Sequence, residues 1–159
     1  MFLGTQVSTM APRIHVAFDE SAQATAALRH ALSTYPNAEI HVLPVNDPRE
    51  WISADAMGGG YYSEEAFEQT QESAKRVLEE ADSIALEYGT DITTATEVGQ
   101  TPAIIVRYAE EHDVEHVVLG SHGRRGLSRF LLGSIAERVA RRAPGSVTII
   151  REPHPEGET

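Results

Sequence analysis

The sequence contains no cysteine and only one lysine, Lys75, among its 159 residues. Without cysteine, the chain has no disulfides and no thiolate metal ligands. No apolar run approaches the roughly 18 residues that a membrane-spanning helix needs. The first ten residues carry no basic side chain and no long apolar stretch, which is not the composition of a secretory signal. These absences predict a cytoplasmic protein without a membrane partner.

Length and composition fit one globular domain. With 41% hydrophobic residues in 159, the chain can fill a single core. We expect the domain to span residues 11–151. Residues 1–10 are expected to form a flexible N-terminal extension, and residues 152–159, rich in proline and acidic side chains, a disordered tail.

The formal net charge of −11 is unevenly distributed. Seven arginines and one glutamate lie between Arg124 and Arg151, so this stretch carries +6 and the remainder −17. An acidic protein with one basic region suits a small anionic ligand better than a nucleic acid, whose phosphate backbone it would repel. The alternative is that Arg138, Arg141 and Arg142 simply lie on the solvated face of a helix.

Apolar runs and helix-start signals alternate along the chain, which predicts strands alternating with helices. Ser21 can cap the first helix, and Gly89 stands where a left-handed residue would end the long second helix. Pro44 indicates the end of a strand or a bulge, because proline cannot donate to a sheet ladder. Strands are expected at 13–18, 39–45, 91–98, 115–119 and 146–151, helices at 22–34, 63–88, 101–112 and 134–142, and a long connection at 46–62.

Five strands alternating with four helices predict a doubly wound α/β fold, in which helices cover both faces of a five-stranded, mainly parallel sheet. In such sheets, ligands bind beyond the carboxyl ends of the strands, where the winding reverses direction. Asp19 follows the first strand, and Gly120 follows the fourth. These two ends are therefore the places to look for a site.

A glycine-rich loop from Gly120 to Ser134 joins the fourth strand to the last helix. Glycines allow a ligand to approach the backbone closely, and free N–H groups at a helix start form an anion site. Ser134 precedes Glu137 by three residues, the spacing of a capping box with Ser134 as the N-cap. A glycine-rich turn before a capped helix, without any ligand, is the alternative, because short glycine patterns are common.

The spacing Gly-x2-Gly-x9-Gly-Ser at Gly120, Gly123, Gly133 and Ser134 resembles the nucleotide loop of the universal stress proteins. The likeness covers about residues 12–151. It includes Asp19, Thr-Pro at 101–102, Val-Val-Leu-Gly-Ser-His-Gly at 117–123 and Leu-Leu-Gly-Ser-Ile-Ala-Glu at 131–137. The resemblance implies sheet order 3-2-1-4-5, binding of ATP or another adenine nucleotide with Mg²⁺, and a homodimer formed through the last strand.

The resemblance also implies roles on the base side of a nucleotide site. Asp19 would face the base or ribose, and a turn residue before the first helix is the alternative. Val45 would pack against adenine, and an ordinary core position is the alternative. Leu119 would line the same side.

On the phosphate side, the resemblance implies that Gly120 and Gly123 leave room for ribose and phosphate. The phosphates would be held by Gly133, by Ser134 and by the main-chain amide of Ile135. The arginines and the histidine inside the loop are expected to face water rather than ligand.

Motifs of catalysis are missing from the sequence, which contains neither a Gly-x4-Gly-Lys-Ser/Thr loop nor a Gly-x-Ser-x-Gly elbow. His112 and His116 flank an expected helix-to-strand turn and would not share a face, which disfavours a zinc site. The sequence favours a universal stress protein that binds nucleotide as a regulatory module of the stress response. A nucleotide-free scaffold and a slow ATP-hydrolysing enzyme of the adenine-nucleotide α-hydrolase-like group stay open as alternatives.

Overall fold

The computed structural model describes residues 11–19, 21–46, 64–98, 101–121 and 132–151. The expected N-terminal extension, the acidic tail and most of the connection at 46–62 lie outside these described residues, as does Gly123. Within the described part of the chain, no helix combines the length and apolar character needed to cross a membrane.

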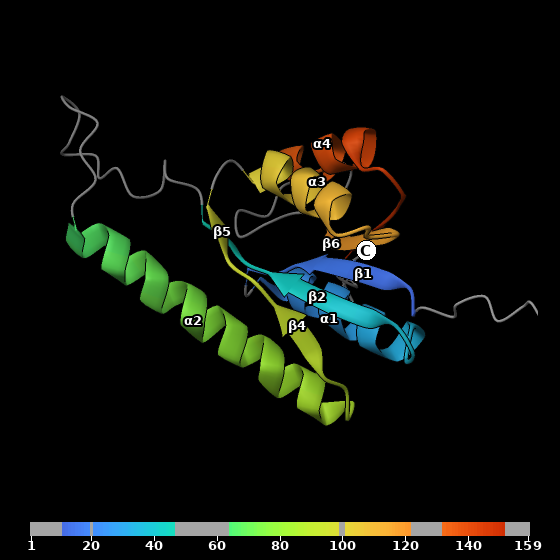
Figure 1. Cartoon of the computed structure of the whole chain (residues 1–159), viewed down its shortest axis with the longest axis horizontal. Coiled ribbons are helices and arrows are strands. Elements are labelled where there is room, and N and C mark those ends of the chain that lie inside the picture. The colour runs from blue at the N-terminus through green and yellow to red at the C-terminus, as the bar shows by residue number, and fades with distance from the viewer. Residues whose placement is uncertain (1–10, 20, 47–63, 99–100, 122–131, 152–159) are drawn as a thin grey trace, which may run out of the picture.

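A five-stranded sheet forms the centre of the molecule, and all its neighbouring strands are parallel (Figure 1). The strands stand in the order β4-β2-β1-β6-β7. Counted along the chain, this is 3-2-1-4-5, so the predicted doubly wound fold and its strand order are confirmed. The strands are β1 (Arg13–Ala17), β2 (Glu39–Leu43), β4 (Ile92–Thr94), β6 (His116–Gly120) and β7 (Ser146–Ile150).

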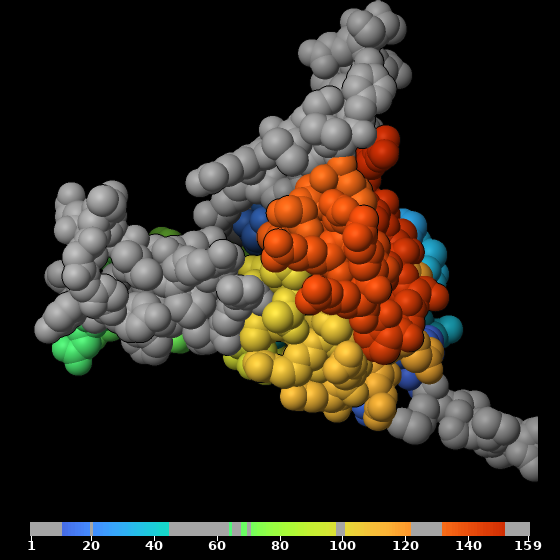
Figure 2. Space-filling view, turned by 90° about the horizontal axis from the view of Figure 1, so that it is seen from above, coloured from blue at the N-terminus to red at the C-terminus, as the bar shows by residue number. Residues whose placement is uncertain are grey.

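The helices of the described residues cover both faces of the sheet (Figure 1). α1 (Ala22–Thr34) and α2 (Glu64–Glu87) lie on one face, and α3 (Thr101–Glu111) and α4 (Ser134–Arg142) on the other. Seen from above, α3 and α4 lie side by side (Figure 2). Each face has its own core because successive strand residues point to opposite sides. Val118 packs towards α1 and α2, whereas Val117 and Leu119 pack towards α3 and α4.

The strands β2 and β4 are continued by a second, two-stranded parallel sheet. In it, β3 (Val45–Asn46) pairs with β5 (Glu97–Val98). Pro44 separates β2 from β3, as its position in the sequence predicted. The single strand expected at 91–98 was wrong, because the structure divides it into β4 and β5. Proline has no N–H to donate, which interrupts the ladder at this level.

The helix ends on the α1–α2 face follow their sequence signals. Ser21 Oγ accepts a hydrogen bond from the Ala24 N–H at 3.1 Å, so Ser21 caps α1 as expected. Gly89 adopts a φ of +64°, the left-handed conformation that ends α2. Both predictions are confirmed, and both depend only on residues close in sequence.

Candidate functional site

The carboxyl ends of β1 and β6 meet where the winding of the sheet reverses. From β1 the chain proceeds to β2 and β4 on one side, and it later crosses to β6 and β7 on the other. Val16 of β1 is in register with Val118 of β6. Asp19 and Gly120 therefore come to the same edge of the sheet, where a ligand of a doubly wound fold is expected.

Asp19 is part of the turn that leads into α1. Its Oδ1 accepts a hydrogen bond from the Ser21 N–H at 2.9 Å, and Ser21 in turn caps the helix. The side chain is half-buried at the edge of the sheet. The structure thus gives Asp19 the turn role that the sequence left as an alternative, and this bond also orients its carboxylate at the mouth of the site.

Gly120 is required by the close approach of α1 to the end of β6. A Cβ added at this position would lie 2.5 Å from Gln23 Cβ and 3.0 Å from the Gln23 carbonyl carbon. Both atoms belong to the first turn of α1 and are not the far end of a flexible side chain. The absence of a side chain at Gly120 therefore has a packing reason that is independent of any ligand.

The two ends of the loop 122–131 are tied together at its stem. The Ser121 N–H donates to the Ile150 carbonyl at 2.8 Å, and the Gly133 N–H donates to the Ser121 carbonyl at 2.8 Å. Ser121 is only 2% exposed. Gly133, which follows the loop in the sequence, therefore lies directly at the end of β6.

The first turn of α4 differs from the expected capping box. The N-cap is Gly133, with φ −63° and ψ 151°, and the Glu137 N–H donates to its carbonyl at 3.0 Å. Ser134 is the first helical residue rather than the cap, so the predicted capping box is wrong. The Glu137 carboxylate instead pairs with Arg141 at 2.9 Å. The helix therefore starts one residue earlier than a capping box at Ser134 requires.

Leu119 and Val45 lie in different parts of the structure. Leu119 is 3% exposed and shares a core with Ala136 and Val139 of α4, so it supports the site from within. The backbone of Val45 pairs with Glu97 in the small sheet, while its side chain lies outside the described residues.

The arginines of α4 lie on its solvated face, which was the alternative that the sequence left open. Arg138, Arg141 and Arg142 are all exposed, and Arg141 pairs with Glu137 of the same helix. Salt bridges of this kind contribute little to stability. The arginines of the loop lie outside the described residues.

His112 and His116 lie apart, and the sequence had predicted that they would not share a face. His112 lies under α3, where its ring stacks on Tyr108 at 3.9 Å between centroids. His116 is hydrogen-bonded to Thr148 and lies beside Tyr35 on the other face of the sheet. No group of three or more metal-ligating side chains is found among the described residues.

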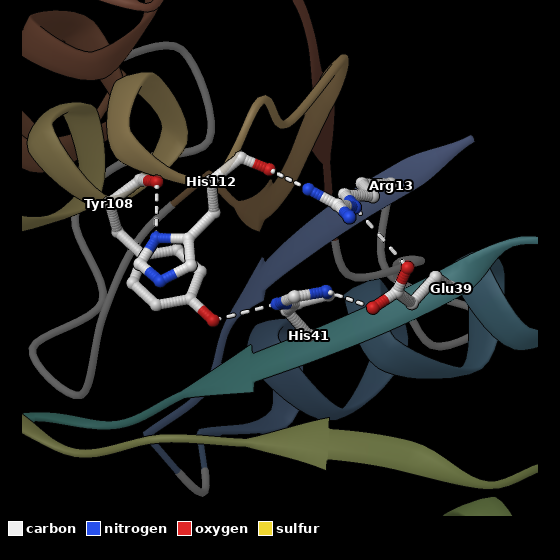
Figure 3. A network of polar contacts seen from close by, with 5 residues as sticks. All are labelled: Arg13, Glu39, His41, Tyr108 and His112. Carbon is white, nitrogen blue, oxygen red and sulfur yellow. Dashed lines mark hydrogen bonds and ion pairs between the residues drawn. The ribbon is translucent and has the colours of Figure 1, made fainter. Parts of the chain in front are cut away.

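A polar network beneath α3 escaped the reasoning from sequence (Figure 3). Its members are Arg13 and Glu39 at the rim, and His41, Tyr108 and His112 further in. The available signal was the tripeptide Ile-His-Val, which occurs at 14–16 in β1 and at 40–42 in β2. The two copies are in register, so their histidines are direct neighbours on one face.

Strand order, switch point and loop stem define a doubly wound α/β domain whose architecture suits a small ligand at the end of β1 and β6. The family model described as the universal stress protein family matches residues 10–151. The chain therefore belongs to the universal stress protein family.

Individual relatives agree with this assignment. Universal stress protein MJ0531 of Methanocaldococcus jannaschii is 32% identical over 147 residues, which cover 91% of this chain and 84% of that protein. The solved structure of MJ0577, from the same organism, has a TM-score of 0.77 and 27% identity, covering 92% of this chain and 100% of that one. A universal stress protein from Archaeoglobus fulgidus, solved in complex with dAMP, has a TM-score of 0.61 and 27% identity, covering 88% and 97%.

Proposed function

We propose that this chain binds an adenine nucleotide, ATP with Mg²⁺ in its working form, and acts as a regulatory module of the stress response in the cytoplasm. The observation that carries the proposal is the meeting of Asp19, the closed loop stem and the start of α4 at the switch point of the sheet. The related structure from Archaeoglobus fulgidus, a complex with dAMP, supports an adenine nucleotide as the ligand.

The start of α4 offers what a phosphate group needs. The N–H groups of Ser134, Ile135 and Ala136 precede the first helical hydrogen bond, which runs from Glu137 to Gly133. Gly133 has no side chain that could cap these N–H groups, and Ser134 is exposed. The positive end of the helix dipole stabilises an anion at the same place. In this proposal the Ser134 hydroxyl and the Ile135 amide bind phosphate. Oxygens of the phosphate groups would also coordinate Mg²⁺.

The opposite side of the proposed site would receive the base and ribose. The Asp19 carboxylate is a hydrogen-bond acceptor that suits a ribose hydroxyl, and the Ser21 N–H already orients it. The proposal assigns the adenine contact to Val45, at the extension of β2, and to the apolar side of Leu119. Gly120 and Gly123 would leave the backbone open between the two halves.

Binding without turnover is the form of the function that the geometry favours. Phosphoryl transfer to water needs a group that positions the attacking water beside the terminal phosphate. In this proposal the Asp19 carboxylate, held by the Ser21 N–H, faces the ribose rather than the terminal phosphate. A regulatory role is therefore proposed over slow ATP hydrolysis, which the same experiment detects.

The test begins with freshly purified protein that is denatured and analysed for released adenine nucleotide by chromatography. Calorimetric titration of the nucleotide-free chain with ATP, ADP and AMP then measures affinity with and without Mg²⁺. Saturable binding is expected. Steady phosphate release by an activity that copurifies with the chain would instead identify an ATP-hydrolysing enzyme and contradict the regulatory role. Failure of all three nucleotides to bind would leave the nucleotide-free scaffold.

Two variants assign the site. Gly133→Val should abolish binding, because its backbone angles suit valine while the side chain fills the space beside the helix start. Ser134→Ala should weaken binding by about 1–2 kcal/mol, the loss of one hydrogen bond to a charged group. Ala140→Val, on the exposed side of the same helix, is the matched control and should bind normally. Normal affinity in both site variants would contradict the assignment.

We also propose a homodimer formed through β7. This strand is the edge of the sheet next to β6, and its residues are half-buried or exposed. An edge strand presents unpaired main-chain groups that a second copy can pair with. Sedimentation analysis should give twice the chain mass at micromolar concentration, and a monomeric mass would contradict the proposed dimer.

A further inference from the structure

Two histidines occupy neighbouring positions on the face of the sheet that α3 covers. His15 of β1 and His41 of β2 are in register, and only 0% and 5% of their surfaces are exposed. The Tyr108 ring of α3 lies against both, with centroids 5.1 Å from His15 and 5.7 Å from His41. His112 stacks on Tyr108 and completes the group. We call His15, His41, Tyr108 and His112 the imidazole cluster.

Both ring nitrogens of His41 have hydrogen-bond partners (Figure 3). Its Nε2 lies 3.0 Å from Glu39 Oε1 and its Nδ1 lies 2.6 Å from the Tyr108 hydroxyl. An ionised carboxylate only accepts, so Nε2–H donates to Glu39 and Nδ1 accepts from Tyr108 in the neutral ring. Side chains on both sides of the ring therefore satisfy the nitrogens of His41.

His15 is in the opposite situation. It is fully buried, and neither of its ring nitrogens has a hydrogen-bond partner within the described part of the chain. Burial, followed by the nearby His41 and His112, lowers the pKa of His15 from 6.5 to about 3. A positive charge without an acceptor inside the protein is strongly disfavoured. With α3 docked, His15 is therefore neutral.

The charged groups near the cluster stand at its rim. Arg13 donates to the His112 carbonyl at 2.8 Å and pairs with Glu39 at 3.3 Å. Glu97 of β5 acts on Tyr108 from the other side, and burial together with Glu97 and Glu39 raises the pKa of Tyr108. None of these contacts provides an acceptor for a His15 nitrogen. The residues that β6 and α4 contribute to this core are apolar, namely Val117, Leu119, Ala136 and Val139.

We propose that the imidazole cluster is an acid-sensitive latch, in which protonation of His15 releases α3 from the sheet. With α3 docked, an imidazolium at His15 would have no acceptor among the described residues and would face His41 on the adjacent strand. With α3 released, water solvates both ring nitrogens. The released state therefore binds the proton more tightly, and acid shifts the equilibrium towards it.

The pH window follows from the two states of His15. Its pKa is about 3 with α3 docked and takes the ordinary value of 6.5 when released. Well above pH 6.5 both states are neutral, and the latch holds. Between pH 6.5 and 3 only the released state is protonated, so docking weakens progressively as the pH falls.

Release of α3 would extend to α4, because the two helices pack side by side (Figure 2). Ala136 of α4 shares a core with Ile105 and Tyr108 of α3. α4 begins at Ser134, where the nucleotide site is proposed, so acid would also loosen that site. The latch itself needs no nucleotide, and its test uses the nucleotide-free chain, so the two proposals can fail separately.

Hydrogen exchange at pH 7 and pH 5, corrected for the intrinsic exchange rates, tests the latch. With pKa values of 6.5 and about 3, the opening constant rises about 20-fold between these pH values. The amides of residues 104–109 in α3 should lose protection by that factor, and the amides of residues 27–32 in α1 should lose less. Unchanged protection in α3, or an equal loss in both helices as in global unfolding, would overturn the proposal.

A pair of histidine variants assigns the effect to one ring. His15→Leu replaces the buried imidazole by an apolar side chain of similar size and should make α3 protection nearly independent of pH. His30→Leu, which removes a half-buried imidazole of α1, is the control and should keep the response of α3. His15→Val, suited to a strand, is used if leucine prevents folding. A pH response of α3 that persists without His15 would refute the assignment.

Discussion

Replacing Gly120 by alanine tests whether the glycine at the end of β6 is needed for packing alone. The added Cβ would stand 2.5 Å from Gln23 Cβ, whereas ordinary contacts begin at 3.4 Å. The first turn of α1 would have to move by about 1 Å, and overpacking of this kind costs about 1–3 kcal/mol. Alanine also restricts the unfolded chain, which returns about 0.4–1 kcal/mol. The expected net loss in the free energy of unfolding is about 1–2 kcal/mol.

Urea unfolding of nucleotide-free protein measures this loss, with the m-value expected to stay constant. A double-mutant cycle with Gln23→Gly provides the control, because that change removes the atom nearest to the new methyl group. Gly120→Ala should cost less in the Gln23→Gly background than in the natural one. An equal cost in both backgrounds, or no cost at all, would show that the approach of α1 is not the reason for glycine at this position.

Three further substitutions test single contacts by urea unfolding at neutral pH. Tyr108→Phe should cost about 1–2 kcal/mol, because His41 Nδ1 is left buried without its hydroxyl partner, and a cost near zero would refute the assigned bond. Ser21→Ala should cost about 1 kcal/mol by uncapping α1 at the Ala24 N–H, so unchanged stability would contradict the cap. Ser134→Ala should leave stability within about 0.5 kcal/mol, since Ser134 is not the N-cap, and a loss equal to that of Ser21→Ala would restore the capping box.

Features of the fold that depend on neighbouring residues were predictable from the sequence. Ser21 caps α1 through an N–H three residues further along, and Gly89 ends the helix that precedes it. Pro44 interrupts its own strand. The alternation of strands and helices then leaves few topologies, because parallel crossovers have one hand. The strand order itself came from family resemblance rather than from these local signals.

The imidazole cluster shows what such signals do not contain. Each Ile-His-Val tripeptide predicts only a buried strand, and a histidine within it suggests nothing beyond a satisfied core position. That His15 and His41 are neighbours depends on the register between β1 and β2. Within the described residues His41 has hydrogen-bond partners and His15 has none, and one partner of His41 is Tyr108, which α3 brings from a distant part of the chain. The difference between the two histidines is therefore a tertiary property.

Local signals were also insufficient at the start of α4, in the candidate site. A capping-box motif is present in the sequence there, but the structure does not form it. Ser134 and Glu137 have the spacing of a capping box, yet the Gly133 N–H is taken by the Ser121 carbonyl at the other end of the loop. Gly133 is extended and is the N-cap, so the helix starts one residue earlier than the capping box would place it. The N–H groups that precede the first helical hydrogen bond are consequently those of residues 134–136 rather than 135–137. The Ser134 hydroxyl consequently has no capping role, and the proposed site assigns it to phosphate instead.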